Sequence, residues 1–151
     1  MPTNFKQFES QVNKFVKTLA PEQAVKFHRL IALEALRRVV FKTPVDTGRA
    51  RGAWQTTIGK ASSKEGKDSN PVATGAGVLS SLKFLQVVYL SNNVPYFDVL
   101  DKGKFRPKNP GPSSDPRKGR KGRVLVKEGF SVQAPKGIIP VTIAELSVIF
   151  R

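Results

Sequence analysis

The stretch PEQAVKFHRLIALEALRRVVFK, residues 21–42, decides the fold because its apolar residues recur with the period of an amphipathic helix. Proline suits the first helical position and the acidic Glu22 suits the first turn, so we predict that the helix starts at Pro21. It should end near Lys42, because Pro44 disfavours helical geometry in the residue before it. The predicted core-facing stripe of this helix consists of Ala24, His28, Ile31, Ala32, Ala35, Leu36 and Val39.

The residues before this stretch show a similar spacing. Apolar side chains stand three and four positions apart from Phe5 to Leu19, which predicts a further amphipathic segment. We therefore expect a long N-terminal helix, either continuous or kinked at Pro21. Its first stripe consists of Phe5, Phe8, Val12, Phe15, Val16 and Leu19.

Strand patterns follow the long helix. After a turn at Asp46-Thr47-Gly48, side chains alternate from Ala53 to Ile58 as they would in a strand. The polar stretch from Lys60 to Ala76 is rich in Ser, Lys and Gly, so we interpret it as a mobile excursion of a hairpin. The stretch QVVYL, Gln86–Leu90, has the β-branched and aromatic content of a strand, and residues 91–93 should turn the chain.

Shorter elements are predicted in the rest of the chain. We expect short helices over Val78–Leu85 and Val94–Lys102, the second ending at Gly103. A hairpin should join Val124–Val126 to Phe130–Val132.

The C-terminal stretch after Pro140, VTIAELSVIF, is ambiguous. Its β-branched residues suit a strand, whereas the initial proline, Glu145 and the spacing of apolar residues suit a helix. We favour the helix. Together these elements predict one α+β domain over residues 1–151, in which the long N-terminal helix and the C-terminal helix pack on a small, mainly antiparallel sheet.

The chain is strongly basic, with 26 Lys and Arg against 11 Asp and Glu and a net charge of +15. Such a charge favours polyanionic partners, either nucleic acid or acidic faces of other proteins. Basic residues concentrate in residues 104–123, where eight of them accompany one acid and four prolines. This segment cannot pack as core, so we expect a long basic loop.

Several chemistries are disfavoured by the composition. The chain has no cysteine and one histidine, His28, so disulfides and the usual zinc ligand sets are excluded, and we expect no metal and no cofactor. The polar N-terminus is unlike a secretory leader, and no apolar run has membrane-spanning length. We expect a soluble protein with no membrane partner.

Three patterns suggest an enzyme only weakly. Asp46-Thr47-Gly48 matches the triplet of aspartic proteases, but it follows a helix stop and precedes Arg49 and Arg51 rather than lying in an all-β scaffold. We interpret it as a capping turn. His28 lies on an apolar helical stripe without a nucleophile pattern nearby, which favours a packing role. Gly75-Ala76-Gly77 lacks the Lys-Ser/Thr sequel of a phosphate loop, so it is a linker or a helix start.

Three stretches together resemble the tail completion or tail terminator family of tailed bacteriophages, which includes the minor tail protein Z type. They are TPVDTGRARGAW (Thr43–Trp54), VVYLSNNVPYFDVLDKG (Val87–Gly103) and QAPKGIIPVTIAEL (Gln133–Leu146). Each stretch is short, but their order and spacing cover most of the chain. One departure is the basic segment 104–123, because family members pass almost directly from the second stretch to the third.

The resemblance implies a structural virion protein and not an enzyme. Such a protein completes or terminates the tail and joins the tail tube to the head connector. We would then expect a homo-oligomeric ring, taken here as a hexamer, with tail tube and head-tail connector or stopper proteins as partners. The protein would be assembled in the host cytoplasm and reside in the virion neck, where DNA passes.

The alternative function is a basic nucleic-acid-binding protein, with residues 104–123 contacting phosphates regardless of sequence. Within the neck reading, that segment would touch passing DNA, dock on a neighbouring ring or remain a solvated loop. Our candidates for interface or partner-binding residues are Asp46, Arg49, Arg51, Trp54, Asn92, Asn93, Tyr96, Lys104, Arg106, Lys108, Arg117, Lys118, Arg120, Lys121 and Arg123.

Overall fold

The computed structural model describes residues 10, 12–14, 17, 20–45, 47–104, 126–127, 129–131 and 133–150. Helices and antiparallel strand pairs alternate along this part of the chain, which confirms the predicted α+β class. The elements are α2 (Ala20–Lys42), α3 (Arg49–Gly52), β1 (Trp54–Ile58), α4 (Pro71–Ser80), β2 (Val88–Asn92), α5 (Phe97–Lys102), β3 (Val126–Lys127), β4 (Phe130–Ser131) and α6 (Ile139–Ile149).

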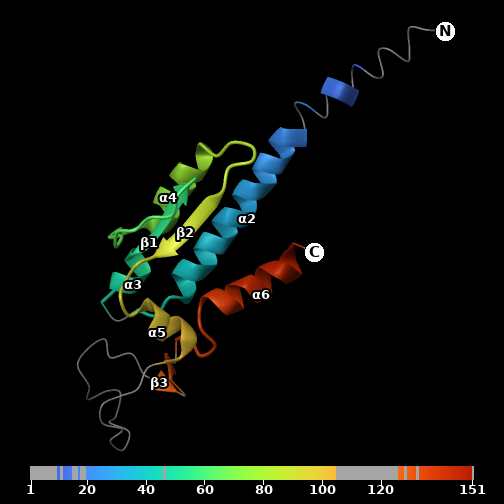
Figure 1. Ribbon diagram of the computed structural model, residues 1–151. Coiled ribbons are helices and arrows are strands. Elements are labelled where there is room, and N and C mark those ends of the chain that lie inside the picture. Colours follow the sequence, from blue (N-terminus) through green and yellow to red (C-terminus); the bar gives the residue numbers. More distant parts are fainter. Residues whose placement is uncertain are drawn as a thin grey trace, which may run out of the picture.

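Helix α2 is the central element of the structure. The pair β1–β2 and helix α4 lie along one side of it, and α6 lies along another (Figure 1). Its bounds agree with the prediction from Pro21 and Pro44, and the predicted stripe residues Ala32, Leu36 and Val39 are buried. At the start of the helix, Ala24 is exposed and His28 is half-buried, because the core lies near the C-terminal half of the helix.

Strands β1 and β2 form an antiparallel pair with Trp54 opposite Asn92 and Ile58 opposite Val88. The strand predicted after Ala53 is confirmed. The second strand lies two residues further along than predicted, and the turn predicted at residues 91–93 is wrong for its first two residues. Ser91 and Asn92 instead continue the pairing with β1, because polar residues are tolerated on a sheet of which one face is open.

Helix α4 corrects two predictions. We expected residues 60–76 to be a loop and Val78–Leu85 to be a helix, but the helix runs from Pro71 to Ser80. Pro71 occupies the first turn, and the Asn70 side chain accepts a hydrogen bond from the amide of Ala73 at 3.2 Å. Gly75 lies inside this helix because it faces Leu36 and Thr56, where a larger side chain would not fit.

The core lies where α2 meets β1 and α5. Trp54 and Phe97 pack edge to face with ring centroids 5.1 Å apart. The C-terminal segment also reaches this core through Ala134 and Ile138. The buried cluster is Leu36, Val39, Val40, Ala53, Trp54, Val94, Phe97, Ala134 and Ile138.

The remaining elements are of the predicted kind, but their bounds differ: α5 begins at Phe97 rather than Val94, and Lys127, expected in the hairpin turn, belongs to β3. Helix α5 is followed by Gly103 in the left-handed conformation, at φ 64°, as expected for a helix C-terminus. Strands β3 and β4 form the predicted hairpin, and the stretch after Pro140 is helical. Most of the predicted Phe5–Leu19 helix, together with residues 105–125, falls outside the described residues. Among the described helices, none combines the length and apolarity of a membrane span.

Candidate interaction surface

Thr43, in the first of the three family-like stretches, joins β1 to the end of α2. Its side chain is fully buried. The hydroxyl donates to the carbonyl of Val39 at 2.6 Å and accepts the indole N–H of Trp54 at 2.8 Å. A buried indole needs such an acceptor, so Thr43 fixes where the strand begins relative to the helix.

Arg51 also belongs to this stretch, and it satisfies carbonyls at the C-terminus of α2. Its Nη2 donates to the carbonyls of Thr43 at 3.0 Å and Phe41 at 3.2 Å. The last carbonyls of a helix have no partner within the helix, and a cation there is also favoured by the helix dipole. Arg51 therefore supports the bend between α2 and α3.

Two asparagines of the second stretch bind backbone carbonyls elsewhere in the chain, and one of them, Asn92, reaches the first stretch. The Asn92 Nδ2 donates to the carbonyl of Ala50 at 2.7 Å. The Asn93 Nδ2 donates to the carbonyls of Ser62 at 2.8 Å and Lys64 at 2.9 Å, so it positions the loop after β1. Both amide groups are thus used inside the chain.

The third stretch contacts the other two. Gln133 makes a reciprocal pair with the backbone of Val45, accepting its N–H at 2.8 Å and donating to its carbonyl at 3.3 Å. The Asp101 Oδ1 accepts the amides of Ile138 and Ile139, both at 2.8 Å, at the start of α6. A carboxylate at this position satisfies unpaired helix amides and suits the dipole. The three stretches therefore meet in one unit.

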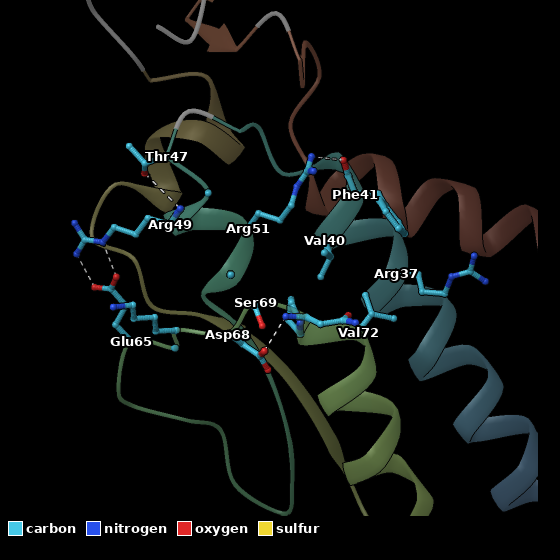
Figure 2. Close-up of a pocket in the computed structure, with 16 residues that line it drawn as sticks. Arg37, Val40, Phe41, Thr47, Arg49, Arg51, Glu65, Asp68, Ser69 and Val72 are labelled. Atoms are coloured by element: carbon cyan, nitrogen blue, oxygen red, sulfur yellow. Dashed lines mark hydrogen bonds and ion pairs between the residues drawn. The ribbon is translucent and has the colours of Figure 1, made fainter. Parts of the chain in front are cut away.

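A surface groove of about 950 Å³ lies beside this unit, between the C-terminal half of α2 and the loop that leads into α4. We call it the basic groove. Figure 2 shows Arg49 and Glu65 on one side, with Arg37, Phe41 and Val72 on the other. Its lining is mainly apolar with a charged rim, and the residues used below are Arg37, Val40, Phe41, Arg49, Arg51, Glu65, Lys67, Asp68, Pro71 and Val72.

Arg49 and Glu65 form a two-point ion pair on one wall of the basic groove. The Arg49 Nε and Nη2 lie 2.6 and 2.7 Å from the two carboxylate oxygens. The guanidinium also lies 5.9 Å from the ring centroid of Tyr96, a cation–π arrangement. Hydrogen bonding from Arg49 lowers the pKa of Glu65, so the pair stays ionised.

The other charges of the groove are not balanced in the same way. Asp68 is engaged locally, since the Thr74 hydroxyl and the Asn70 amide lower its pKa. Within the described part of the chain, no carboxylate lies within ion-pair distance of Arg51 or Lys67. Arg37 has only a long contact of 3.7 Å with Glu34. The groove thus presents positive charge beside an apolar floor.

The structure separates the candidate residues into groups. Arg49 and Arg51 line the groove, and Tyr96 lies next to Arg49 with 38% of its surface exposed. Lys104 pairs with Asp98 at 3.2 Å on the surface. The prediction that Trp54 is an interface residue is wrong, because its ring is buried in the core. Outside the described residues lie Asp46, Arg106, Lys108, Arg117, Lys118, Arg120, Lys121 and Arg123.

Sequence reasoning missed three groove residues, Arg37, Glu65 and Lys67. The sequence pattern places Arg37 on the solvent-exposed face of the long helix. Glu65 and Lys67 lie in the polar stretch that we interpreted as a loop. Nothing near Glu65 in the sequence indicates that it forms an ion pair, because its partner Arg49 is sixteen positions away. Only the path of the chain brings the two together.

His28 lies half-buried beside a small hollow lined by Ala24, Val25 and Phe84. This agrees with the packing role predicted for it. Among the described residues, no group of three His, Asp or Glu side chains is placed to hold a metal ion.

Comparisons of this chain with protein-family models, with curated proteins and with solved structures found no match.

Proposed function

We propose that this chain is a structural virion protein of a tailed-phage neck, which completes or terminates the tail and joins the tail tube to the head connector. The observation that carries the proposal is the convergence of the three family-like stretches. Asn92, Asp101 and Gln133 link these stretches in space although they are distant in sequence. Residues that define a shared fold are expected to be linked in this way.

The use of these polar groups supports a role in architecture. The side chains of Arg51, Asn92 and Gln133 bind backbone groups of the chain itself. Such contacts shape a surface for assembly rather than presenting a nucleophile with a base and an orienting partner, as acyl transfer or proteolysis would need. In this proposal the protein acts by presenting two different faces to its neighbours in a ring.

Exposed apolar side chains support an assembled state. On α2, Phe27 and Leu30 are 53% and 56% exposed, and on α6, Ile143 and Val148 are 62% and 67% exposed. Figure 1 shows that these two helices lie side by side. Exposed apolar side chains on neighbouring helices are typical of contact sites with other proteins. In the proposed ring, neighbouring subunits cover these side chains.

The test is electron microscopy of lysates from a phage that carries a nonsense mutation in this gene. We expect full heads beside unattached tails. Overlong tails would indicate a terminator, and tails of normal length a completion factor. A plasmid copy of the gene should restore joined particles, and intact infectious particles without it would contradict the proposal.

A second candidate function, sequence-independent binding of nucleic acid, is favoured by the net charge of +15 and the eight basic residues between 104 and 123. Phosphate contacts release counterions, so affinity for duplex DNA should then fall steeply with salt. Titration of labelled duplex DNA at two salt concentrations tests this. Binding that is tight and independent of salt, or absent, contradicts it.

A further inference from the structure

The basic groove combines two features that call for different contacts from one occupant. Its floor is apolar, with Val40, Pro71 and Val72 beneath the rim and the exposed ring of Phe41 at one edge. Its rim carries Arg51 and Lys67, which have no carboxylate of the described chain within ion-pair distance, and Arg37, which has only the 3.7 Å contact with Glu34. An occupant that satisfies both must bring apolar groups and negative charge.

We propose that the basic groove binds an acidic segment of another protein, which inserts an apolar side chain over Phe41 and Val72 and places carboxylates near Arg37 and Lys67. Arg37 and Lys67 are exposed, so they can meet carboxylates without rearrangement of the chain. The inference rests on the proposed function only in taking that protein to be a neighbour in the neck.

A second copy of this chain fits the groove poorly. Two copies with a net charge of +15 each repel, and most acids on the described surface are already paired, with the exposed Glu22 as an exception. Asp98 is bound by Lys102 and Lys104, and Glu145 by Lys42 and Arg38. A different chain that carries net negative charge therefore fits the groove better than a second copy does.

Nucleic acid also fits the groove less well than an acidic peptide. Phosphates follow one another at short, fixed spacing, so a strand laid along the groove would pass the ionised Glu65 and Asp68 as well as the cations. A peptide can place its carboxylates only where cations lie. Among the described residues that line the groove, Phe41 is the sole aromatic one, so a strand would gain little from base stacking there.

The test uses the full chain and a fluorescent peptide made of three repeats of Glu-Asp-Phe-Leu, with anisotropy as the readout. We expect saturable binding that the double variant Arg37→Glu/Lys67→Glu weakens about tenfold or more. The matched control Lys26→Glu/Lys83→Glu makes the same charge change on exposed residues outside the groove and should leave affinity within about twofold. Phe41→Ser, or a peptide with Ser in place of Phe and Leu, should also weaken binding.

Two results would overturn the inference. Equal loss in the groove and control variants would mean that the peptide follows the net charge alone. Tighter binding of a DNA oligonucleotide of matched charge, weakened by the same groove variants, would assign the groove to nucleic acid. Circular dichroism establishes that each variant is folded, and since Phe41 is 65% exposed, Phe41→Ser keeps the test valid if the charge variant is unstable.

The test of the groove inference can fail independently of the test of the proposed neck function. A phage that needs this gene to join heads and tails, but whose Arg37→Glu/Lys67→Glu variant joins them normally, would overturn the groove inference alone. Infectious particles from the nonsense phage would instead contradict the neck role, while the peptide measurement would still decide what the groove binds.

Discussion

The hydroxyl of Thr43 connects two elements through one buried atom, because it donates to Val39 and accepts from the indole of Trp54. Thr43→Val keeps the shape but leaves the indole N–H without a partner. Leaving a buried donor unsatisfied costs about 1–3 kcal/mol, so we expect that loss in the free energy of unfolding, measured with urea. Thr43→Ser retains the hydroxyl and should lose less, and a Ser variant as unstable as the Val variant would contradict this role.

Asp101 joins the second family-like stretch to the third. Its carboxylate accepts the two amides that begin α6, so Asp101→Ala should lower the free energy of unfolding by about 1–2 kcal/mol. Asp98→Ala is the matched control, because Asp98 makes only exposed ion pairs with Lys102 and Lys104. Thermal melts of both variants test this, and equal melting temperatures would show that Asp101 does not hold α6.

At the residue scale, sequence reasoning found the right positions but not always the right contacts. Asn92, Asn93 and Trp54 were selected as interface candidates, yet their polar atoms bind the chain itself. A turn-forming asparagine and a capping asparagine look alike in sequence, because both are polar residues near glycine or proline. Which carbonyl accepts their N–H groups depends on chain segments tens of residues away.

At the scale of elements, α4 packs against α2 through a glycine. A Cβ on Gly75 would overlap the Leu36 side chain and approach the Thr56 Oγ1 to 2.6 Å. Gly75→Ala should therefore cost about 1–3 kcal/mol of unfolding free energy, although alanine alone favours a helix. Gly77 lies in the same helix with open space around it, so Gly77→Ala should instead gain about 0.5–1 kcal/mol. Urea unfolding measures both, and equal effects would contradict the packing.

The same helix shows why some elements were predictable and others were not. The periodic apolar stripe before Pro44 predicted α2, because burial on one face imposes that period. The spacing after Pro140 predicted α6, although the chain itself leaves Ile143 and Ile149 of that stripe exposed. Helix α4 contains two glycines, Gly75 and Gly77, and a polar stretch precedes it, so local helix propensity did not favour a helix here. The Asn70-Pro71 start was the available signal, and packing on α2 overrides the weak propensity.

Helices α2 and α6 are also joined by charge, which makes their contact sensitive to pH. Hydrogen bonds from Lys42 and then Arg38 lower the pKa of Glu145 below its ordinary value of 4.5. A carboxyl whose pKa is lower in the folded state stabilises the fold at pH values above its ordinary pKa. This stabilisation is lost as the pH falls through the lowered pKa. Because Glu145 is about one-third exposed, solvent screens the effect and we expect it to be small.

The measurement is urea unfolding of Glu145→Gln and of the unaltered chain over a pH series. The variant should be slightly less stable at neutral pH, and the difference should vanish below the lowered pKa. Glu22→Gln, an exposed acid at the far end of α2, is the matched control and should show a smaller difference at neutral pH. A difference for Glu145→Gln that persists at low pH would show that the side chain acts by packing rather than by charge.

At the scale of the whole molecule, stability of the subunit and assembly of the ring should be separable. Ile143 and Val148 are more than half exposed on α6, so replacing both with Ser should change the melting temperature of the monomer little. If neighbours cover this face in the proposed ring, the same variant should shift sedimentation toward monomer, because it removes apolar area buried only on assembly. The matched control, Ser63→Ala with Ser80→Ala, alters exposed polar residues outside both α6 and the basic groove and should leave assembly unchanged. A variant that still forms oligomers like the unaltered chain would place the contact on other surfaces of the molecule.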